Sequence, residues 1–595
     1  MISSNIKFVI VVSFFIPTLI FANWQQPPNF ESQINAILKK HHIPGAVIGV
    51  VSSDDMLYLK GFGVEDLESE RPVDSETSVF RVASLSKLIT TVAVLQFVDQ
   101  NQIGLHDDIA PYLDDFKIPS KHHQPITLFH LLTHTAGFDR YNTDPRVLYE
   151  SDVLPLEASL KKYLLPSVIT PGEGSLYSNH GMALAGLVLE KLSGVSFEVC
   201  VEANVFQPLD MHRSSFRTED VHVVQGYRWV PEGVEPVQFE YTQTIPSSML
   251  MTTGGDMCRF LRMVLGYGQR NGYQLLSKQW ADSMLTQQFT NYPAFPGMGL
   301  GFFEYDYHGY RYFGHGGSIT GFHAQVDVFP EKDLAFLLMF NQLRGGQVAR
   351  HEIESILFET LDLESNQAMR VKSGSIERPL DTFAGHYYFG RHLSQTTAQK
   401  WNMYLSNAEV IVRSADNLLL IDDESSDSFF ENPDSAQGWR AVGFKDRADG
   451  SVGYLVRDDG DVYVRLSVWE YARLNRWIVR GMALLFLSAM FLAFFQKHLL
   501  WIGVCTVSVL NGACLLGIHL LSGPNQSGFS VMYRFLLSYP FFAVLCLVWL
   551  MWMVWRKSDA QLGRLLKLSM GLLVTGQVML LVFLNHWNLL GWRFF

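Results

Sequence analysis

The stretch Ser84-Leu85-Ser86-Lys87-Leu88-Ile89-Thr90-Thr91-Val92 decides the fold. Its apolar residues recur at helical spacing, which predicts a buried helix that begins at Ser84 and places Lys87 one turn along the same side. A serine hydroxyl is a weak nucleophile near neutral pH, and a buried lysine held neutral can act as its base. The helix N-terminus adds exposed N–H groups and a positive dipole end. The stretch therefore predicts a nucleophilic serine.

A Ser-x-x-Lys spacing also occurs at Ser4 to Lys7 and at Ser159 to Lys162. Ser84 is therefore distinguished only if further motifs follow it in the expected order along the chain. The second element is Tyr177-Ser178-Asn179, which follows Pro171-Gly172. We expect Tyr177 to share the proton of Ser84 with Lys87 and to pass it to the leaving group, and Asn179 to bind the substrate's amide or carbonyl. Taken alone, the same residues are also typical of an ordinary turn.

The third element is His315-Gly316-Gly317-Ser318, between the strand-like runs Tyr310 to Phe313 and His323 to Phe329. Glycines such as Gly317 let a substrate lie along the strand edge as an added strand. The N–H groups of Ser84 and Ser318 are the predicted oxyanion hole. A histidine in a turn needs no function, so this element is weak by itself.

Together the three elements resemble the family of class C β-lactamases, low-molecular-mass D,D-peptidases, D-aminopeptidases and related esterases. That family has Ser-x-x-Lys, Tyr-x-Asn and Lys/His-x-Gly in this order. The resemblance extends over about residues 23 to 362 and includes four further landmarks: Pro44-Gly45-Ala46, Leu128 to Gly137, Phe206 to Met211 and Leu250 to Met257. It implies an α/β (α+β) sandwich with a helical insertion that completes the cleft.

One residue differs from the motif of class C β-lactamases, which carry Lys where this chain has His315. This difference limits the kinds of activity that we expect. An imidazole has a reference pKa of about 6.5, so it is only partly charged at neutral pH when it binds a substrate carboxylate. The change fits peptidases and esterases better than β-lactamases. Which of Lys87 and Tyr177 accepts the proton of Ser84 stays open.

The two ends of the chain predict a membrane protein. Residues 1–22 have the pattern of a signal peptide, with an uncleaved anchor as the alternative. Four apolar runs approach the ~20 residues that cross a bilayer: Ile478 to Phe495, Leu499 to Leu521, Phe535 to Trp555 and Leu568 to Leu590. Basic residues between Arg556 and Lys567 agree with a cytoplasmic loop. These features predict a multi-pass protein of the plasma (inner) membrane, with the lipid bilayer as a partner and the catalytic domain facing the periplasm or the outside.

Between the hydrolase-like part of the chain and the C-terminal apolar runs, the sequence pattern changes to short β-strands. Short β-rich runs at 440–444, 453–456 and 462–466 are separated by Asp449-Gly450 and Asp459-Gly460, which are hairpin signals. We therefore predict four units: a signal peptide (1–22), a β-lactamase-like serine hydrolase domain (23–372), a small antiparallel β domain (373–475) and a four-helix transmembrane module (476–595).

Other chemistries are disfavoured. The formal net charge of -12 and the lack of long basic runs argue against nucleic acid as a partner. His130 and His134 have a spacing that can bind zinc, but the Glu of a His-Glu-x-x-His motif is missing. The five cysteines lie far apart and give no metal or disulfide pattern. No metal or cofactor is expected.

Two classes of function remain open. In the first, Ser84 forms an acyl-enzyme with a peptide, D-amino-acid amide or ester, including substrates derived from the cell wall, and hydrolysis of β-lactams or removal of a D-amino-acid cap are variants. In the second, the chain is a penicillin-binding sensor or a non-catalytic membrane protein. The predicted inner loops are too short for a cytoplasmic output domain, which favours the enzyme.

Overall fold

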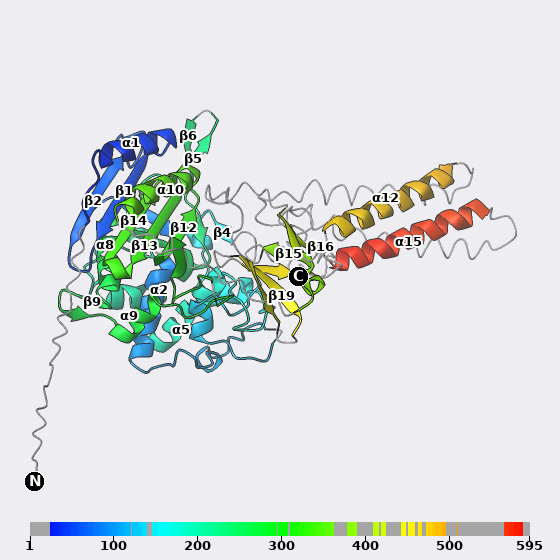
Figure 1. The fold of residues 1–595 in the computed structure, drawn as a ribbon, viewed down its shortest axis with the longest axis horizontal. Helices are drawn as coiled ribbons and strands as arrows, with labels where there is room; N and C mark the ends of the chain where they lie inside the picture. The colour runs from blue at the N-terminus through cyan, green and yellow to red at the C-terminus, as the bar shows by residue number, and fades with distance from the viewer. Residues whose placement is uncertain are drawn as a thin grey trace, which may run out of the picture.

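The computed structural model describes residues 24–120, 122–139, 145–231, 233–293, 295–307, 310–361, 378–389, 409–415, 418–423, 442–447, 450–457, 462–466, 472–494, 507 and 564–586. A six-stranded antiparallel sheet, here called the main sheet, runs through the first part of the chain in the order β11-β12-β13-β14-β1-β2 (Figure 1). Its strands are β1 (Gly45–Val51), β2 (Met56–Gly63), β11 (Phe303–Tyr307), β12 (Tyr310–Ile319), β13 (Phe322–Phe329) and β14 (Leu334–Phe340).

The main sheet joins distant parts of the chain, since β1 pairs with β14 in the register Ile48↔Leu338. All seven residues of β1 are buried, as expected for a strand covered on both faces. Alternate residues of β1 and β14 pack into two cores: Ile48 and Leu338 lie in the core with the terminal helices α1 and α10, whereas Val47 and Leu337 lie in the core with α2 and α8. The helices of this part are α1 (Phe30–Lys40), α2 (Ser86–Asp99), α3 (Leu128–Leu132), α4 (Leu156–Tyr163), α5 (Asn179–Ser193), α6 (Phe197–Val201), α7 (Ile245–Ser248), α8 (Gly254–Leu265), α9 (Lys278–Met284) and α10 (Leu343–Glu359).

Several two-stranded pairs lie outside the main sheet. β3 (Phe80–Ala83) pairs with β8 (Leu250–Thr252), directly before α2. The other pairs are β4 (Arg146–Val147) with β7 (Tyr241–Thr242), β5 (Tyr227–Val230) with β6 (Gly233–Pro236), and β9 (Gln269–Arg270) with β10 (Tyr273–Gln274).

A second six-stranded antiparallel sheet, here called the second sheet, has the order β17-β16-β15-β20-β19-β18. Tyr387, Tyr454 and Leu455 are among its buried residues. Figure 1 shows its yellow strand β19 between the main body and the two C-terminal helices. The strands are β15 (Gly385–Phe389), β16 (Glu409–Ala415), β17 (Leu418–Asp423), β18 (Val442–Asp446), β19 (Val452–Arg457) and β20 (Val462–Arg465).

The predicted four-helix transmembrane module, and with it a multi-pass protein of the plasma membrane, is wrong. Of the helices in the described part of the chain, none combines the length and the apolar character that a membrane span requires. The helices α12 (Ala472–Phe494) and α15 (Arg564–His586) pack against each other. The Phe486 ring lies against Gly576, where a Cβ would come within 2.9 Å of it. Some of the apolar residues that suggested a membrane span therefore pack between α12 and α15.

Two of the predicted spans, Leu499 to Leu521 and Phe535 to Trp555, lie outside the described residues apart from Val507. The predicted signal peptide of residues 1–22 also lies outside them.

Candidate active site

Ser84 lies at the junction between β3 and α2. Ala83, the last residue of β3, has a φ of 47°, a left-handed conformation that is unusual for a residue with a side chain. The Lys87 N–H donates to Ser84 O over 3.0 Å, and the helix proper begins at Ser86 rather than at Ser84. The Ser86 hydroxyl donates to Ala83 O and accepts from the Leu250 N–H. These bonds fix the backbone turn that presents the half-buried Ser84 side chain.

Lys87 is fully buried, and its amine lies against the Ser84 hydroxyl. Lys87 Nζ is 3.0 Å from Ser84 Oγ and donates to Ser247 O over 2.9 Å. It also lies 4.7 Å from the centroid of the Tyr177 ring. The neighbouring Thr90 hydroxyl donates to Pro246 O, so α2 and α7 are joined directly. The short helix α7 therefore supplies a second acceptor for the lysine amine.

Tyr177 reaches Ser84 from the other side of the hydroxyl. Its OH donates to Ser84 Oγ over 2.8 Å. The ring packs 4.5 Å from the His134 ring and 6.1 Å from the Phe303 ring, centroid to centroid. Lys87 and Tyr177 thus meet at one oxygen, which is the arrangement that proton transfer from a nucleophilic serine requires.

The loop of residues 171–178, here called the tyrosine loop, is held by the segment that contains α3. Leu176 N–H donates to His134 O over 2.7 Å, Gly172 N–H donates to Thr135 O over 2.8 Å, and the Ser175 hydroxyl donates to Thr133 O over 3.1 Å. The Ser178 N–H lies 3.3 Å from His134 Nδ1, which accepts from it. The landmark Leu128 to Gly137 therefore works as the support of Tyr177.

The third element runs along the edge of β12. His315 to Ser318 are not in a turn but inside this strand, which is continuous from Tyr310 to Ile319. On one edge the pairing of β12 with β11 ends at Gly314, whereas on the other edge the pairing with β13 continues to Ile319. A Cβ at Gly317 would lie 2.1 Å from Val82 O and 3.2 Å from Ser84 N. Glycine thus allows β12 to approach the backbone at the serine.

His315 and Gly317 face the same side of the main sheet as α2. The His315 side chain is 2% exposed, its Nδ1–H donates to Gly316 O over 2.7 Å, and its ring centroid lies 5.2 Å from that of Phe303 and 6.2 Å from that of Tyr177. Ser318 is exposed, and its Oγ is 3.0 Å from His323 Nδ1. Burial lowers the pKa of His323 to about 3, so this imidazole is neutral. Asn179, the first residue of α5, is half-buried.

Two partners of the site carry no signal in the sequence. Ser247 contributes its backbone carbonyl, and His323 lies five residues beyond Ser318 across a strand turn. Arg81 of β3, close in sequence to Ser84, is 2% exposed, donates to Glu240 O over 2.7 Å and has its guanidinium 3.9 Å from the Phe239 ring centroid. Burial, together with the charge of Arg146, lowers the pKa of Arg81 to about 9.

The histidines considered for zinc have structural contacts. His130 Nδ1 accepts from the Thr127 N–H over 3.3 Å, which completes a capping box at the start of α3. Burial lowers the pKa of His130. Within the described residues, no group of three or more His, Cys, Asp or Glu side chains is placed to hold a metal ion.

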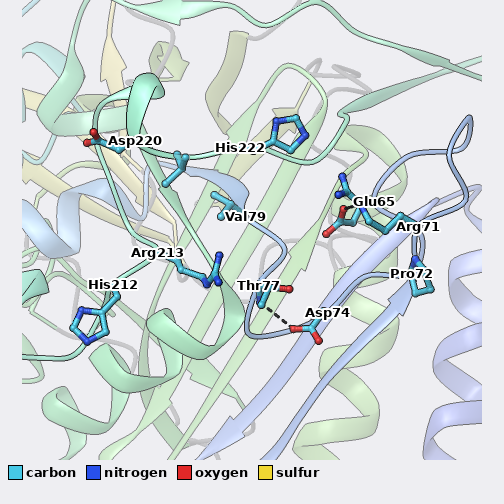
Figure 2. A pocket seen from close by; sticks show the side chains of 11 residues that line it. Glu65, Arg71, Pro72, Asp74, Thr77, Val79, His212, Arg213, Asp220 and His222 are labelled. Carbon is cyan, nitrogen blue, oxygen red and sulfur yellow. Dashed lines mark hydrogen bonds and ion pairs between the residues drawn. The ribbon is translucent and has the colours of Figure 1, made fainter.

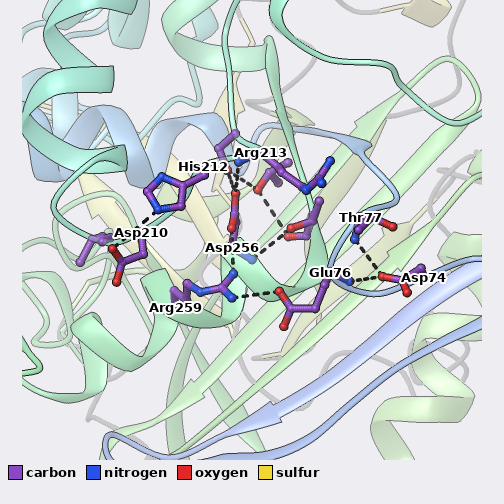
Figure 3. A network of polar contacts seen from close by, with 12 residues as sticks. Asp74, Glu76, Thr77, Asp210, His212, Arg213, Asp256 and Arg259 are labelled. Atoms are coloured by element: carbon purple, nitrogen blue, oxygen red, sulfur yellow. Dashed lines mark hydrogen bonds and ion pairs between the residues drawn. The ribbon is translucent and has the colours of Figure 1, made fainter.

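A cavity of about 650 Å³ lies apart from these residues, and none of the predicted site residues lines it. Figure 2 shows Arg213 and Thr77 on its wall, with Glu65 and Arg71 together at another part of it. Figure 3 shows the polar network beside it, in which Asp256 accepts from the Arg213 N–H. Asp256 also accepts from the Ser214 hydroxyl. Because Asp256 lies in the first turn of α8, this network accounts for the landmark Leu250 to Met257 structurally.

The fold is that of β-lactamase-type hydrolases, which are related to the penicillin-binding proteins. The family model described as Beta-lactamase matches residues 30–360, more than half of the 595 residues, and the chain belongs to this family.

The individual relatives are only distantly similar to this chain in sequence. Penicillin-binding protein 4* of Bacillus subtilis (strain 168) is 27% identical over 216 residues, which cover 35% of this chain and 44% of that protein. Protein flp of Staphylococcus aureus (strain N315) is 27% identical over 247 residues, which cover 38% of this chain and 47% of that protein. The chain therefore spans less than half the length of these two relatives. The solved structure of SurE is 19% identical, with a TM-score of 0.51 over 73% of this chain and 98% of that one, and shares the fold.

Proposed function

We propose that this chain is a serine hydrolase that acts through an acyl-enzyme on Ser84. The observation that carries the proposal is the position of Ser84 Oγ, which lies 3.0 Å from Lys87 Nζ and 2.8 Å from Tyr177 OH. A hydroxyl between an amine and a phenol can lose its proton as it attacks, because either group can accept it or relay it.

The proposed reaction has two halves. Ser84 Oγ attacks the substrate carbonyl carbon while its proton passes to Lys87 Nζ or Tyr177 O, and the carbonyl oxygen becomes an oxyanion. The oxyanion accepts from the N–H groups of Ser84 and Ser318. The tetrahedral intermediate collapses, and the leaving group departs with the proton that Tyr177 delivers. Water then attacks the Ser84 ester, and the serine regains its proton as the acid is released.

The substrate is proposed to lie along the edge of β12 beyond Gly314. Gly317 keeps that edge close to Ser84, and Asn179 at the start of α5 binds the amide or carbonyl of the acyl group. His315 is proposed to contact a substrate carboxylate or to shape the strand. The sequence difference from Lys at this position favours peptides, D-amino-acid amides and esters over β-lactams.

Two similar proteins guide the choice of substrates for a test. SurE, which shares the fold, has been solved with D-Leu, and a relative in Bacillus subtilis is described as a penicillin-binding protein. The full chain and Ser84→Ala would be compared on D-leucinamide, a D-alanyl dipeptide, p-nitrophenyl acetate and a fluorescent penicillin. We expect turnover of at least one of these that Ser84→Ala lacks. Equal turnover by both proteins would contradict the proposal.

A further inference from the structure

The second sheet contacts the loop that carries Tyr177. Tyr454 on β19 is 2% exposed, and its phenol lies close enough to the Glu173 carboxylate for that charge to help raise the pKa of the phenol. A Cβ at the next residue, Gly174, would lie 4.0 Å from Tyr454 Cε1, so the ring lies directly on the tyrosine loop. These contacts join residues that are far apart in the chain, since Tyr454 lies in the second sheet and Glu173 and Gly174 lie in the tyrosine loop.

A second contact lies beside the first. Lys445 on β18 is the cross-strand partner of Tyr454, and its Nζ lies 5.1 Å from the centroid of the Phe289 ring. Phe289 forms a bridge with Met298, whose sulfur accepts from the Ser175 hydroxyl over 3.3 Å. The β18–β19 hairpin therefore touches the tyrosine loop directly through Tyr454 and indirectly through Lys445.

The charges around Tyr454 keep its phenol neutral. Burial, and then the negative charge of Glu173, raise the pKa of the Tyr454 phenol, so it stays protonated beside the carboxylate. The positive charge of Arg447 partly offsets the carboxylate.

The tyrosine loop is held from two sides. Backbone and hydroxyl bonds to Thr133, His134 and Thr135 fix it to the family fold, and the Ser175 N–H donates to Asn291 Oδ1 over 2.9 Å. Glu173, four residues before Tyr177, contacts the second sheet. Since a displacement of about 1 Å at a reacting group can cost ~100-fold in rate, a support this close to Tyr177 affects the chemistry.

We propose that the second sheet is part of the catalytic unit, and that Tyr454, acting through Glu173, is a positioning residue for Tyr177. The inference rests on the proposed role of Tyr177 at Ser84. It gives the second sheet a function in the reaction itself, beyond spacing the domains apart.

The test uses the full chain and the variants Tyr454→Phe, Glu173→Ala and the double variant. A fluorophosphonate probe measures the rate of acylation of Ser84, and hydrogen exchange measures the protection of the amides of residues 172–178. We expect each single variant to react about tenfold more slowly and to exchange faster at these amides. The double variant is expected to react no more slowly than the slower single variant, because both changes remove one contact.

Tyr387→Phe is the matched control, since the buried Tyr387 phenol donates to Phe383 O within the second-sheet region. It is expected to lower stability without changing acylation. Acylation of Tyr454→Phe at the wild-type rate, or slowing by Tyr387→Phe to the same extent, would overturn the inference. A wild-type chain that does not react at Ser84 would instead refute the proposed function. In that case unchanged exchange at residues 172–178 in Tyr454→Phe would also refute the contact.

Discussion

Lys87 Nζ joins Ser84 Oγ, 3.0 Å away, to the carbonyl oxygen of Ser247, 2.9 Å away and 160 residues further along the chain. Ser84 and Lys87 come from one short backbone turn, but the orientation of the lysine depends on α7. A buried amine with two fixed oxygen partners has little freedom to move away from the serine.

Lys87→Met should abolish most of the activity while the fold is kept. Methionine has a similar length and fills the buried space, but it can neither accept a proton from Ser84 nor donate to Ser247 O. We expect kcat/KM to fall by about 10³-fold or more. Lys161→Met is the control, because Lys161 is an exposed lysine on α4. A rate for Lys87→Met within tenfold of wild type would remove Lys87 from the mechanism.

Tyr177→Phe tests the proton relay separately. The ring contacts with His134 and Phe303 are kept, and only the hydroxyl 2.8 Å from Ser84 Oγ is lost. We expect kcat to fall by about 10² to 10⁴-fold, the usual contribution of a positioned acid or base. Combined with Lys87→Met, the loss should be far from additive, because both groups serve one proton transfer. Additive losses would indicate two independent roles.

The sequence predicted the meeting of Ser84, Lys87 and Tyr177 in one site because helical spacing and the order of the elements are local or family features. It could not predict the Ser247 carbonyl, because a backbone acceptor leaves no side-chain signature. The contact of Tyr454 with the tyrosine loop could not be predicted for another reason, since it joins a strand and a loop that are far apart in the chain. The sequence also allowed His315 to lie in a turn between two strands, whereas β12 runs straight through His315 and its two glycines.

The membrane spans were wrongly predicted because the sequence does not show what an apolar helix packs against. A count of apolar residues does not distinguish a face buried against lipid from one buried against another helix, and Phe486 of α12 lies on Gly576 of α15. The same ambiguity affects any short apolar helix.

Gly317→Ala should damage both stability and activity. The added Cβ would lie 2.1 Å from Val82 O and 3.2 Å from Ser84 N, so β12 or β3 must move. We expect a loss of about 1–3 kcal/mol in the free energy of unfolding and a lower acylation rate. Gly316→Ala is the control, because its Cβ would meet the end of the Gln325 side chain, at 2.9 Å, instead of the backbone. Urea unfolding of both variants checks this, and equal effects would contradict the close approach of β12 to Ser84.

His323 should make the protein less stable in acid. Burial lowers the pKa of His323 to about 3, whereas an unfolded histidine titrates near ~6.5. Between these values the unfolded chain binds more protons, so the stabilisation is complete above about pH 6.5 and is lost as the pH falls toward 3. In His323→Asn, the decline of the unfolding free energy between about pH 6 and 4 should be shallower by about 1 kcal/mol per pH unit. Parallel curves for the two proteins would show that His323 does not titrate differently in the folded state.

The identity of the nucleophile is tested most directly by intact-mass analysis of the full chain after reaction with a fluorophosphonate, followed by peptide mapping. The geometry around Ser84 Oγ predicts a single covalent adduct, located on Ser84 and absent from Ser84→Ala. Ser86 is an internal control, since its hydroxyl is buried between Ala83 O and the Leu250 N–H and should stay unmodified. An adduct that persists in Ser84→Ala, or that maps to another residue, would contradict the assignment of Ser84 as the nucleophile.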